Sequence, residues 1–227
     1  MVTLDASQLT VRELNKRLKK LARDGAEITI LNPQARHNIV AAIFQTSKIT
    51  IAGSVGYFAA SLLDGPEVSI NGNAGWALGD NMMSGKIILS KDAGASVAST
   101  MRGGEVFVGG NAGARAGISM KGGTLIVGGN TGFMTGFMMQ KGEIIVCGDV
   151  GDAVGDSMYE GTIYVAGKIG SLGTDAVFND IREGELIRIW DTLEGYGIND
   201  KPRFAKIVSS KKLYHFDSLD RLEKTVI

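Results

Sequence analysis

A 19-residue repeat runs through the middle of the chain and restricts its fold more than any other feature. Written from Ile49, seven units follow one another without insertion, beginning at residues 49, 68, 87, 106, 125, 144 and 163. Each unit opens with an apolar–x–apolar triplet such as Val106–Phe107–Val108, which is typical of a short strand with one buried face. One such unit cannot bury its apolar face alone and must stack on its neighbours. The repeat therefore predicts a solenoid with one unit per turn.

Glycine occupies fixed positions in this repeat. It fills the eighth position of all seven units and the fifth position of every unit except the one that carries Lys91. Glycine permits a positive φ at bends and the close approach of neighbouring backbones. We therefore predict structural roles for the glycines at the fifth, eighth and twelfth positions, namely Gly72, Gly75, Gly79, Gly110, Gly113, Gly117, Gly129, Gly132, Gly136, Gly148, Gly151 and Gly155. Units that lack a glycine, at Lys91, Ala98 and Thr174, are expected to bulge.

Two further positions have a consistent chemical character. The sixth is mostly Asn or Asp, which tolerate turn geometry, so a polar ladder is predicted along one corner through Asn73, Asp92, Asn111, Asn130 and Asp149. The fifteenth is apolar in every unit and is predicted to face the core: Leu63, Met82, Met101, Met120, Met139, Met158 and Val177. No His or Cys accompanies these Met residues, which argues against a thioether metal site.

These patterns predict an all-β protein, a right-handed parallel β-helix over residues 28–181. A capping helix is expected within residues 1–27, because Thr10 and Glu13 have the spacing of a capping box and Leu14 and Leu18 follow at helical spacing. Residues 28–31 are expected to form the strand of an irregular first turn. Residues 182–227 are expected to form a second helix, near 185–197, and a tail that either covers a face of the solenoid or contacts a partner.

The composition excludes several classes of protein. Basic and acidic residues both number 24, and this balance argues against a nucleic-acid-binding protein. The single cysteine, Cys147, excludes an internal disulfide framework and suits a reducing compartment. The first residues lack the apolar core of a signal peptide, so no secretory leader is expected, and no run of 18 apolar residues is present to span a membrane. We therefore expect a cytoplasmic protein.

No set of residues in the sequence predicts catalysis, cofactor binding or metal binding. The glycine runs lack the GK[ST] sequence and the following helix of a phosphate loop. His37 and His215 are far apart, and Cys147 occupies a turn position. The densest carboxylates are Asp149, Asp152 and Asp156. They leave open a hard-cation site, or a solenoid enzyme acting on a polysaccharide, but a solvated or partner-facing acidic patch is favoured.

Outward-facing positions hold more apolar residues than a solvated rod requires. The second position carries Ile88, Phe107, Ile126, Ile145 and Tyr164, and one unit adds four more apolar residues. Large apolar strips usually mark interfaces. Burial against other proteins is favoured over burial beneath the terminal helix and tail, and the interface candidates are Phe107, Phe133, Met134, Phe137, Met138, Tyr164, Tyr214 and Phe216.

The recurring G-x-x-G-x-x-x-G pattern resembles the GXGXG β-helix family, which includes the C-terminal domain of the glutamate synthase large subunit and the β-helix subunit of formylmethanofuran dehydrogenase. Several segments are more similar to the stand-alone GXGXG subunits of three-subunit glutamate-synthase-like complexes, such as that of N-methylglutamate synthase: ARHNIVAAI (35–43), NMMSGK (81–86), GISMKGG (117–123), VCGDVGDAVGDSMYEGTIYV (146–165), SLGTDAV (171–177) and KKLYHF (211–216). The last of these favours this branch over the formylmethanofuran one.

The resemblance implies a division of labour. A glutamine-amidotransferase-like subunit and a synthase subunit with FMN and an iron–sulfur cluster would carry the chemistry, and this chain would be a scaffold without a cofactor in a hetero-oligomer. In the N-methylglutamate branch, the complex converts methylamine and L-glutamate to N-methylglutamate and ammonia. A scaffold resembling the β-helix subunit of formylmethanofuran dehydrogenase, beside a tungsten or molybdenum pterin, is the alternative within the fold family.

Overall fold

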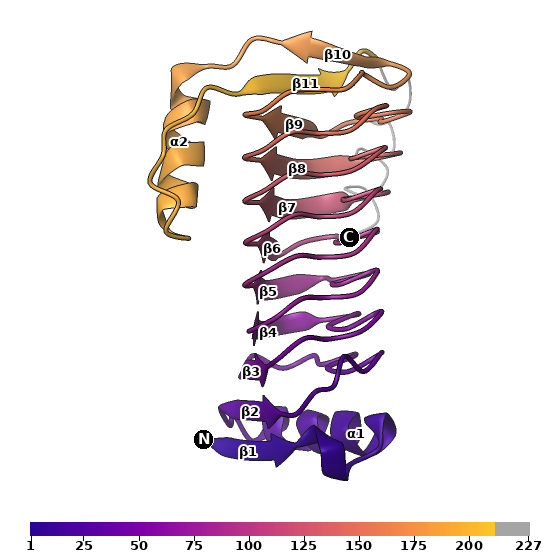
Figure 1. Ribbon diagram of the computed structural model, residues 1–227, viewed down its shortest axis with the longest axis vertical. Helices are drawn as coiled ribbons and strands as arrows, with labels where there is room; N and C mark the ends of the chain where they lie inside the picture. Colours follow the sequence, from indigo (N-terminus) through magenta and orange to yellow (C-terminus); the bar gives the residue numbers. More distant parts are fainter. Residues whose placement is uncertain (212–227) are drawn as a thin grey trace, which may run out of the picture.

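The computed structural model describes residues 1–211, which form a column of stacked parallel strands with a helix at one end and another along one side (Figure 1). The helices are α1 (Val11–Arg23) and α2 (Glu183–Glu194), and a short 3-10 helix spans Ala6–Gln8. The strands are β1 (Val2–Asp5), β2 (Ile28–Leu31), β3 (Lys48–Ala52), β4 (Asp64–Ile70), β5 (Ser84–Leu89), β6 (Glu105–Val108), β7 (Lys121–Val127), β8 (Lys141–Val146), β9 (Thr162–Val165), β10 (Ala176–Asn179) and β11 (Ala205–Ser209).

The strands of the repeat pair in register. Strands β1 to β9 follow one another as parallel neighbours in a single sheet. Val106 pairs with Leu125, and Leu125 with Ile144, each at the 19-residue step of the sequence. The first turn is irregular as expected, because Ile28 pairs with Ile49 across a longer interval. The predicted parallel β-solenoid, of about seven turns, is thereby confirmed.

A second backbone ladder runs along the opposite side of each turn. Alternate residues of this ladder have the left-handed conformation, with φ of 54° at Phe58, 52° at Ala60 and 56° at Leu62. Left-handed backbone costs a non-glycine residue roughly 1–2 kcal/mol. Stacking offsets this cost, because each of these N–H groups donates to a neighbouring turn, as Phe58 does to the carbonyl of Trp76 at 2.9 Å. Positive φ was expected at glycine, and in this ladder non-glycine residues adopt it as well.

The glycines at the fifth and eighth positions allow close approach of neighbouring turns, and of these only Gly53, in the first unit, has a positive φ. A Cβ on Gly113 would lie 2.7 Å from the Ala95 nitrogen of the turn before. A Cβ on Gly148 would collide with Asn130 Oδ1, which is part of the predicted polar ladder. In that ladder, Asn130 Oδ1 accepts from the Asp149 N–H at 2.7 Å. The twelfth-position glycines combine positive φ with a tight fit, as Gly117 does at 71°, and the eighteenth-position glycines do the same, as Gly123 does at 77°.

The turns that lack a glycine do not bulge where expected. The strand ladders are irregular between Asp64 and Glu67 and between Lys121 and Thr124, away from Lys91 and Ala98. Ala98 adopts the left-handed conformation itself, with φ of 56°. Next to Lys91, the ladder bond from the Asp92 N–H to Asn73 Oδ1 is 3.2 Å, longer than the 2.7 Å between the Asn111 N–H and Asp92 Oδ1 in the next turn.

The fifteenth position lines the core, with one exception. Leu63, Met82, Met101, Met120, Met139 and Met158 are all fully buried. Val177, by contrast, is 39% exposed, so its predicted core position is wrong. The last turn is one residue shorter, since Val154 pairs with Leu172, and this shift places Ala176 in the core. It also brings Gly173, and not Thr174, into the twelfth position, where its N–H donates to Val154.

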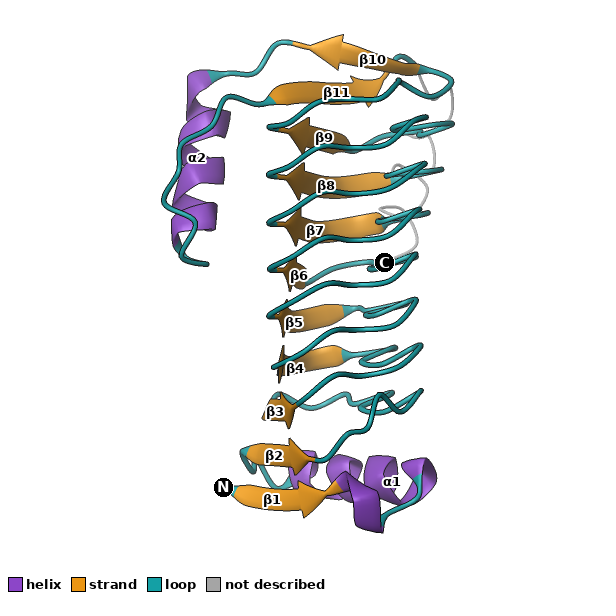
Figure 2. Cartoon of the chain, in the orientation of Figure 1, coloured by secondary structure: helices purple, strands orange, loops and turns teal. Residues whose placement is uncertain are grey.

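Both ends of the column are closed by the chain itself (Figure 2). At the first end, α1 buries Leu14 and Leu18 in the core, and its capping box at Thr10 and Glu13 is confirmed. The strand β1 beside it was not predicted. At the other end, β11 pairs antiparallel with both β9 and β10, so this part of the tail covers the solenoid.

Candidate interaction surfaces

Helix α2 covers the strip of apolar residues at the second position of the repeat. Phe107 and Tyr164 are 7% and 1% exposed, and they form a second core with Ile189 and Leu193 of α2 and Phe204. The expectation that Phe107 and Tyr164 contact another protein is therefore wrong, because this chain's own helix buries them. At the second position, the polar Thr50 and Ser69 of the first two units give way to the apolar Ile88 and Phe107. This change from polar to apolar residues was the sequence signal for the surface that α2 covers.

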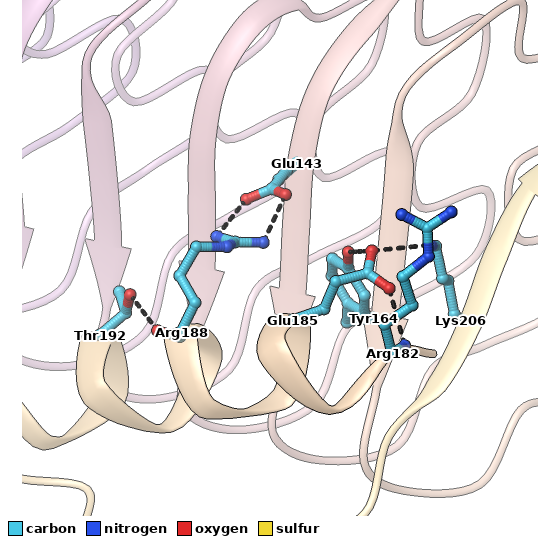
Figure 3. Close-up of polar contacts among 7 residues, drawn as sticks. All are labelled: Glu143, Tyr164, Arg182, Glu185, Arg188, Thr192 and Lys206. Carbon is cyan, nitrogen blue, oxygen red and sulfur yellow. Dashed lines mark hydrogen bonds and ion pairs between the residues drawn. The ribbon is translucent and has the colours of Figure 1, made fainter. Parts of the chain in front are cut away.

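Charged pairs hold α2 against the sheet (Figure 3). The Arg188 guanidinium donates two hydrogen bonds to the Glu143 carboxylate, at 2.7 and 2.8 Å. Glu185 accepts from Lys206 Nζ at 2.6 Å, from the Arg182 N–H at 2.8 Å and from the Tyr164 hydroxyl at 3.0 Å. Just after α2, the Tyr196 hydroxyl donates a hydrogen bond to Glu105.

These contacts determine the protonation states beneath α2. The Lys206 hydrogen bond, followed by that from the Arg182 N–H, lowers the pKa of Glu185 to about 2. Burial, together with the hydrogen bond to Glu185, raises the pKa of Tyr164 far above its usual value. At neutral pH a charged carboxylate thus accepts from a protonated phenol. The polar groups of this cluster are occupied with one another, so we assign them to anchoring α2.

The three clustered aspartates cap the following turn. Asp149 Oδ1 accepts from the Lys168 N–H at 2.7 Å, Asp152 from the Ser171 hydroxyl at 3.0 Å, and Asp156 from the Thr174 N–H at 3.2 Å. Within residues 1–211, no three His, Cys, Asp or Glu side chains gather closely enough to hold a metal ion.

The remaining candidates for chemistry are also engaged in structural contacts. His37 Nδ1 accepts from the Tyr57 N–H at 2.8 Å, while His215 lies outside the described residues. Burial raises the pKa of the Cys147 thiol to about 11, which disfavours the thiolate that a nucleophile needs. A phosphate loop binds its anion through free backbone N–H groups. In the glycine-rich turns, the N–H groups of Gly110 and Gly113 instead donate to carbonyls of the previous turn.

The side of the column that carries the left-handed ladder exposes apolar side chains in two places. On one turn, Phe133 and Met138 are 45% and 40% exposed, and Met134 and Phe137 are half-buried. Tyr214 and Phe216 lie outside the described residues. Nearer the first end is a second group that was not predicted: Tyr57, Phe58, Leu62 and Trp76, with Trp76 58% exposed. In the sequence, both groups could have been found from bulky apolar residues at the ninth, tenth and fourteenth positions of neighbouring units.

The second group forms a stack beside a groove. The rings of His37 and Tyr57 are 4.5 Å apart, and those of Tyr57 and Trp76 are 5.3 Å apart, all nearly parallel. Beyond Trp76 opens a groove of about 330 Å³. Its lining carries no charge: Tyr57, Phe58, Trp76, Ala77, Ser96, Ser99, Thr100, Ile118 and Ser119.

The repeat and its stacked glycines have a counterpart among known protein families. Residues 24–185 match the GXGXG motif. The chain belongs to the GXGXG family. The GXGXG domain is found in glutamate-synthase-like proteins. A comparison of this GXGXG chain with curated proteins gives no match. In the described part of the chain, neither helix has the length and apolar character that crossing a bilayer requires.

Proposed function

We propose that this chain is a non-catalytic scaffold subunit of a glutamate-synthase-type complex, that of N-methylglutamate synthase. In this complex it bridges a glutamine-amidotransferase-like subunit and a synthase subunit that holds FMN and an iron–sulfur cluster. The complex is cytoplasmic and converts methylamine and L-glutamate to N-methylglutamate and ammonia.

The observation that carries this proposal is the exposed apolar side of a rigid column belonging to this family. Trp76, Phe58 and Phe133 expose about half of their surface, or more in the case of Trp76. A solenoid buries its core by stacking and needs no outward aromatic residues for that purpose. Exposed aromatic groups with polar surroundings are typical of surfaces that bind other proteins.

Purification of the full chain from cells that encode it tests the proposal. We expect the tagged chain to retain a flavoprotein, with the yellow absorbance of FMN, and an amidotransferase-like protein. The preparation should form N-methylglutamate from methylamine and L-glutamate, whereas the chain expressed alone should be colourless and inactive. A chain that alone binds flavin, or that retains a protein with a tungsten or molybdenum pterin, would refute the proposal.

A further inference from the structure

The outward side of α1 is a dense array of positive charge. Six of its thirteen residues are basic, at positions other than the buried Leu14, Leu18 and Ala22, and all but Lys19 are exposed: Arg12, Lys16, Arg17, Lys19, Lys20 and Arg23. The ion pairs found among residues 1–211 lie elsewhere, on Lys86, Arg188, Lys206 and Lys211.

The one acidic residue of α1 does not neutralise this charge. Glu13 accepts from the Thr10 N–H at 2.9 Å and from the Thr10 hydroxyl at 2.8 Å, and these bonds lower its pKa. The carboxylate therefore serves the helix cap. Its charge also acts on Arg17, but the ion pairs found in the described part of the chain include none of the basic residues of α1, all of which except Lys19 are exposed.

The basic side of α1 continues into the apolar groove. Glu13 lies at the border between a hollow lined by Lys16 and Lys20 and a second hollow lined by His37. His37 stacks on Tyr57, and Tyr57 on Trp76 at the mouth of the groove. One surface thus leads from six cations, past a column of aromatic rings, to an uncharged groove. We call it the α1–Trp76 surface.

We infer that the α1–Trp76 surface binds an acidic segment of a partner protein whose apolar side chains enter the groove beside Trp76. Charge complementarity argues for this occupant, since the cations of α1 attract an anionic segment and the groove accommodates apolar side chains. The inference rests on the proposed scaffold function, and it identifies one docking site and the chemistry of its partner.

The same surface suits single-stranded nucleic acid less well. Bases stack on open aromatic faces beside a basic track for the phosphates. Here, one face of His37, both faces of Tyr57 and one face of Trp76 are occupied by the stack itself. The cations gather on α1, and the residues lining the groove are uncharged. The distribution of charge therefore favours a protein.

Charge reversal in the native complex tests the inference. Lys16→Glu/Lys20→Glu changes two exposed residues of α1, and Trp76→Ser changes the groove separately. Lys141→Glu/Lys168→Glu, at exposed positions far from α1, is the matched control. Each full-length tagged variant is purified from the encoding cells at about 0.15 M salt, where exposed charges still act over about 8 Å. The bound partner is quantified by mass spectrometry, and a carbodiimide joins lysines to neighbouring carboxylates.

We expect both test variants to lose one partner roughly tenfold or more, as for hot-spot residues, and the control to retain it. In the wild type, Lys16 or Lys20 should be linked to Asp or Glu of that partner. Three outcomes would overturn the inference: equal recovery of the partner from all variants, no retained protein, or links that join the partner's carboxylates only to lysines of this chain outside α1. Recovery of single-stranded nucleic acid by the α1–Trp76 surface would also overturn it.

The test separates the inference from the proposed function. If the flavoprotein and the amidotransferase-like protein are retained by every variant, the inference fails and the scaffold function stands. If the partner lost on charge reversal is unrelated to glutamate synthase, the inference stands and the proposed function fails. Melting temperatures equal to that of the wild type are required of each variant, so that loss of binding does not reflect unfolding.

Discussion

Replacing one ladder glycine by alanine should separate two turns of the column. Gly148 does not have a positive φ, so alanine there causes no backbone strain. Its added Cβ would collide with Asn130 Oδ1 and would lie 2.7 and 2.8 Å from the carbonyl oxygen and carbon of Gly129. Two of these three atoms belong to the backbone and can withdraw only if the turns move apart.

The loss of stability in Gly148→Ala can be estimated from the hydrogen bond and the packing that the added Cβ disturbs. Asn130 Oδ1 also accepts from the Asp149 N–H at 2.7 Å, and a hydrogen bond of this kind contributes about 1 kcal/mol. Overpacking costs a further 1–3 kcal/mol or so. We expect Gly148→Ala to lower the free energy of unfolding by about 2–4 kcal/mol. In a chain of this size, that loss lowers the melting temperature by roughly 4–16 °C.

The same substitution at Gly184 is the matched control. A Cβ there meets nothing within 4 Å, and the residue lies in the first turn of α2. Alanine favours helix over glycine by up to about 1 kcal/mol, so Gly184→Ala should be neutral or stabilising. Both variants are compared by urea and thermal unfolding followed by circular dichroism, and by hydrogen exchange at Asp149. A Gly148→Ala protein within about 0.5 kcal/mol of wild type would refute the close-approach argument.

Three further predictions concern the core, the α2 anchor and the thiol. Met120→Ala empties a fully buried position and should cost about 2–5 kcal/mol in urea unfolding; a loss below 1 kcal/mol or so would mean that the core collapses around the gap. The pKa of Glu185 is lowered in the folded state, so its stabilisation is complete above its unfolded value, near 4.5, and is lost as pH falls toward about 2. Glu185→Gln should therefore flatten the fall in melting temperature between pH 6 and pH 3, and an unchanged slope would contradict this. With its pKa raised to about 11, Cys147 should react slowly with a disulfide reagent at pH 8 and rapidly in urea, and equal rates would count against its burial.

The left-handed ladder shows one limit of reading structure from this sequence. Phe58, Ala60 and Leu62 have no residue-level preference for positive φ, yet all three adopt it. Their conformation depends on hydrogen bonds to turns about 19 residues away on either side, which local propensity does not record. By contrast, the polar ladder through Asn111 and Asn130 was predictable, because identical side chains recur at the period of the stack.

The outward surface shows a second limit. Phe107 and Phe133 are similar apolar residues on the outside of the column, and both were interface candidates. Phe107 packs against Tyr196 with ring centroids 4.0 Å apart, whereas Phe133 is 45% exposed. The second position, which holds Phe107, becomes apolar along the repeat, but this pattern does not say whether a partner or the chain itself covers it. That difference arises from where α2 returns along the column.

The sequence by itself determined the turn length, the inward core and the glycine positions of this protein. A period of 19 residues allows only one stacking register, and each position of the repeat meets its own copy in the next turn. The tertiary structure alone decided which outward residues remain available to partners. Helix α2 lies far along the chain from Phe107 yet buries it, whereas Trp76 and the basic side of α1 stay exposed. Contacts between segments so distant in sequence depend on the folded path of the chain, and no local pattern encodes that path.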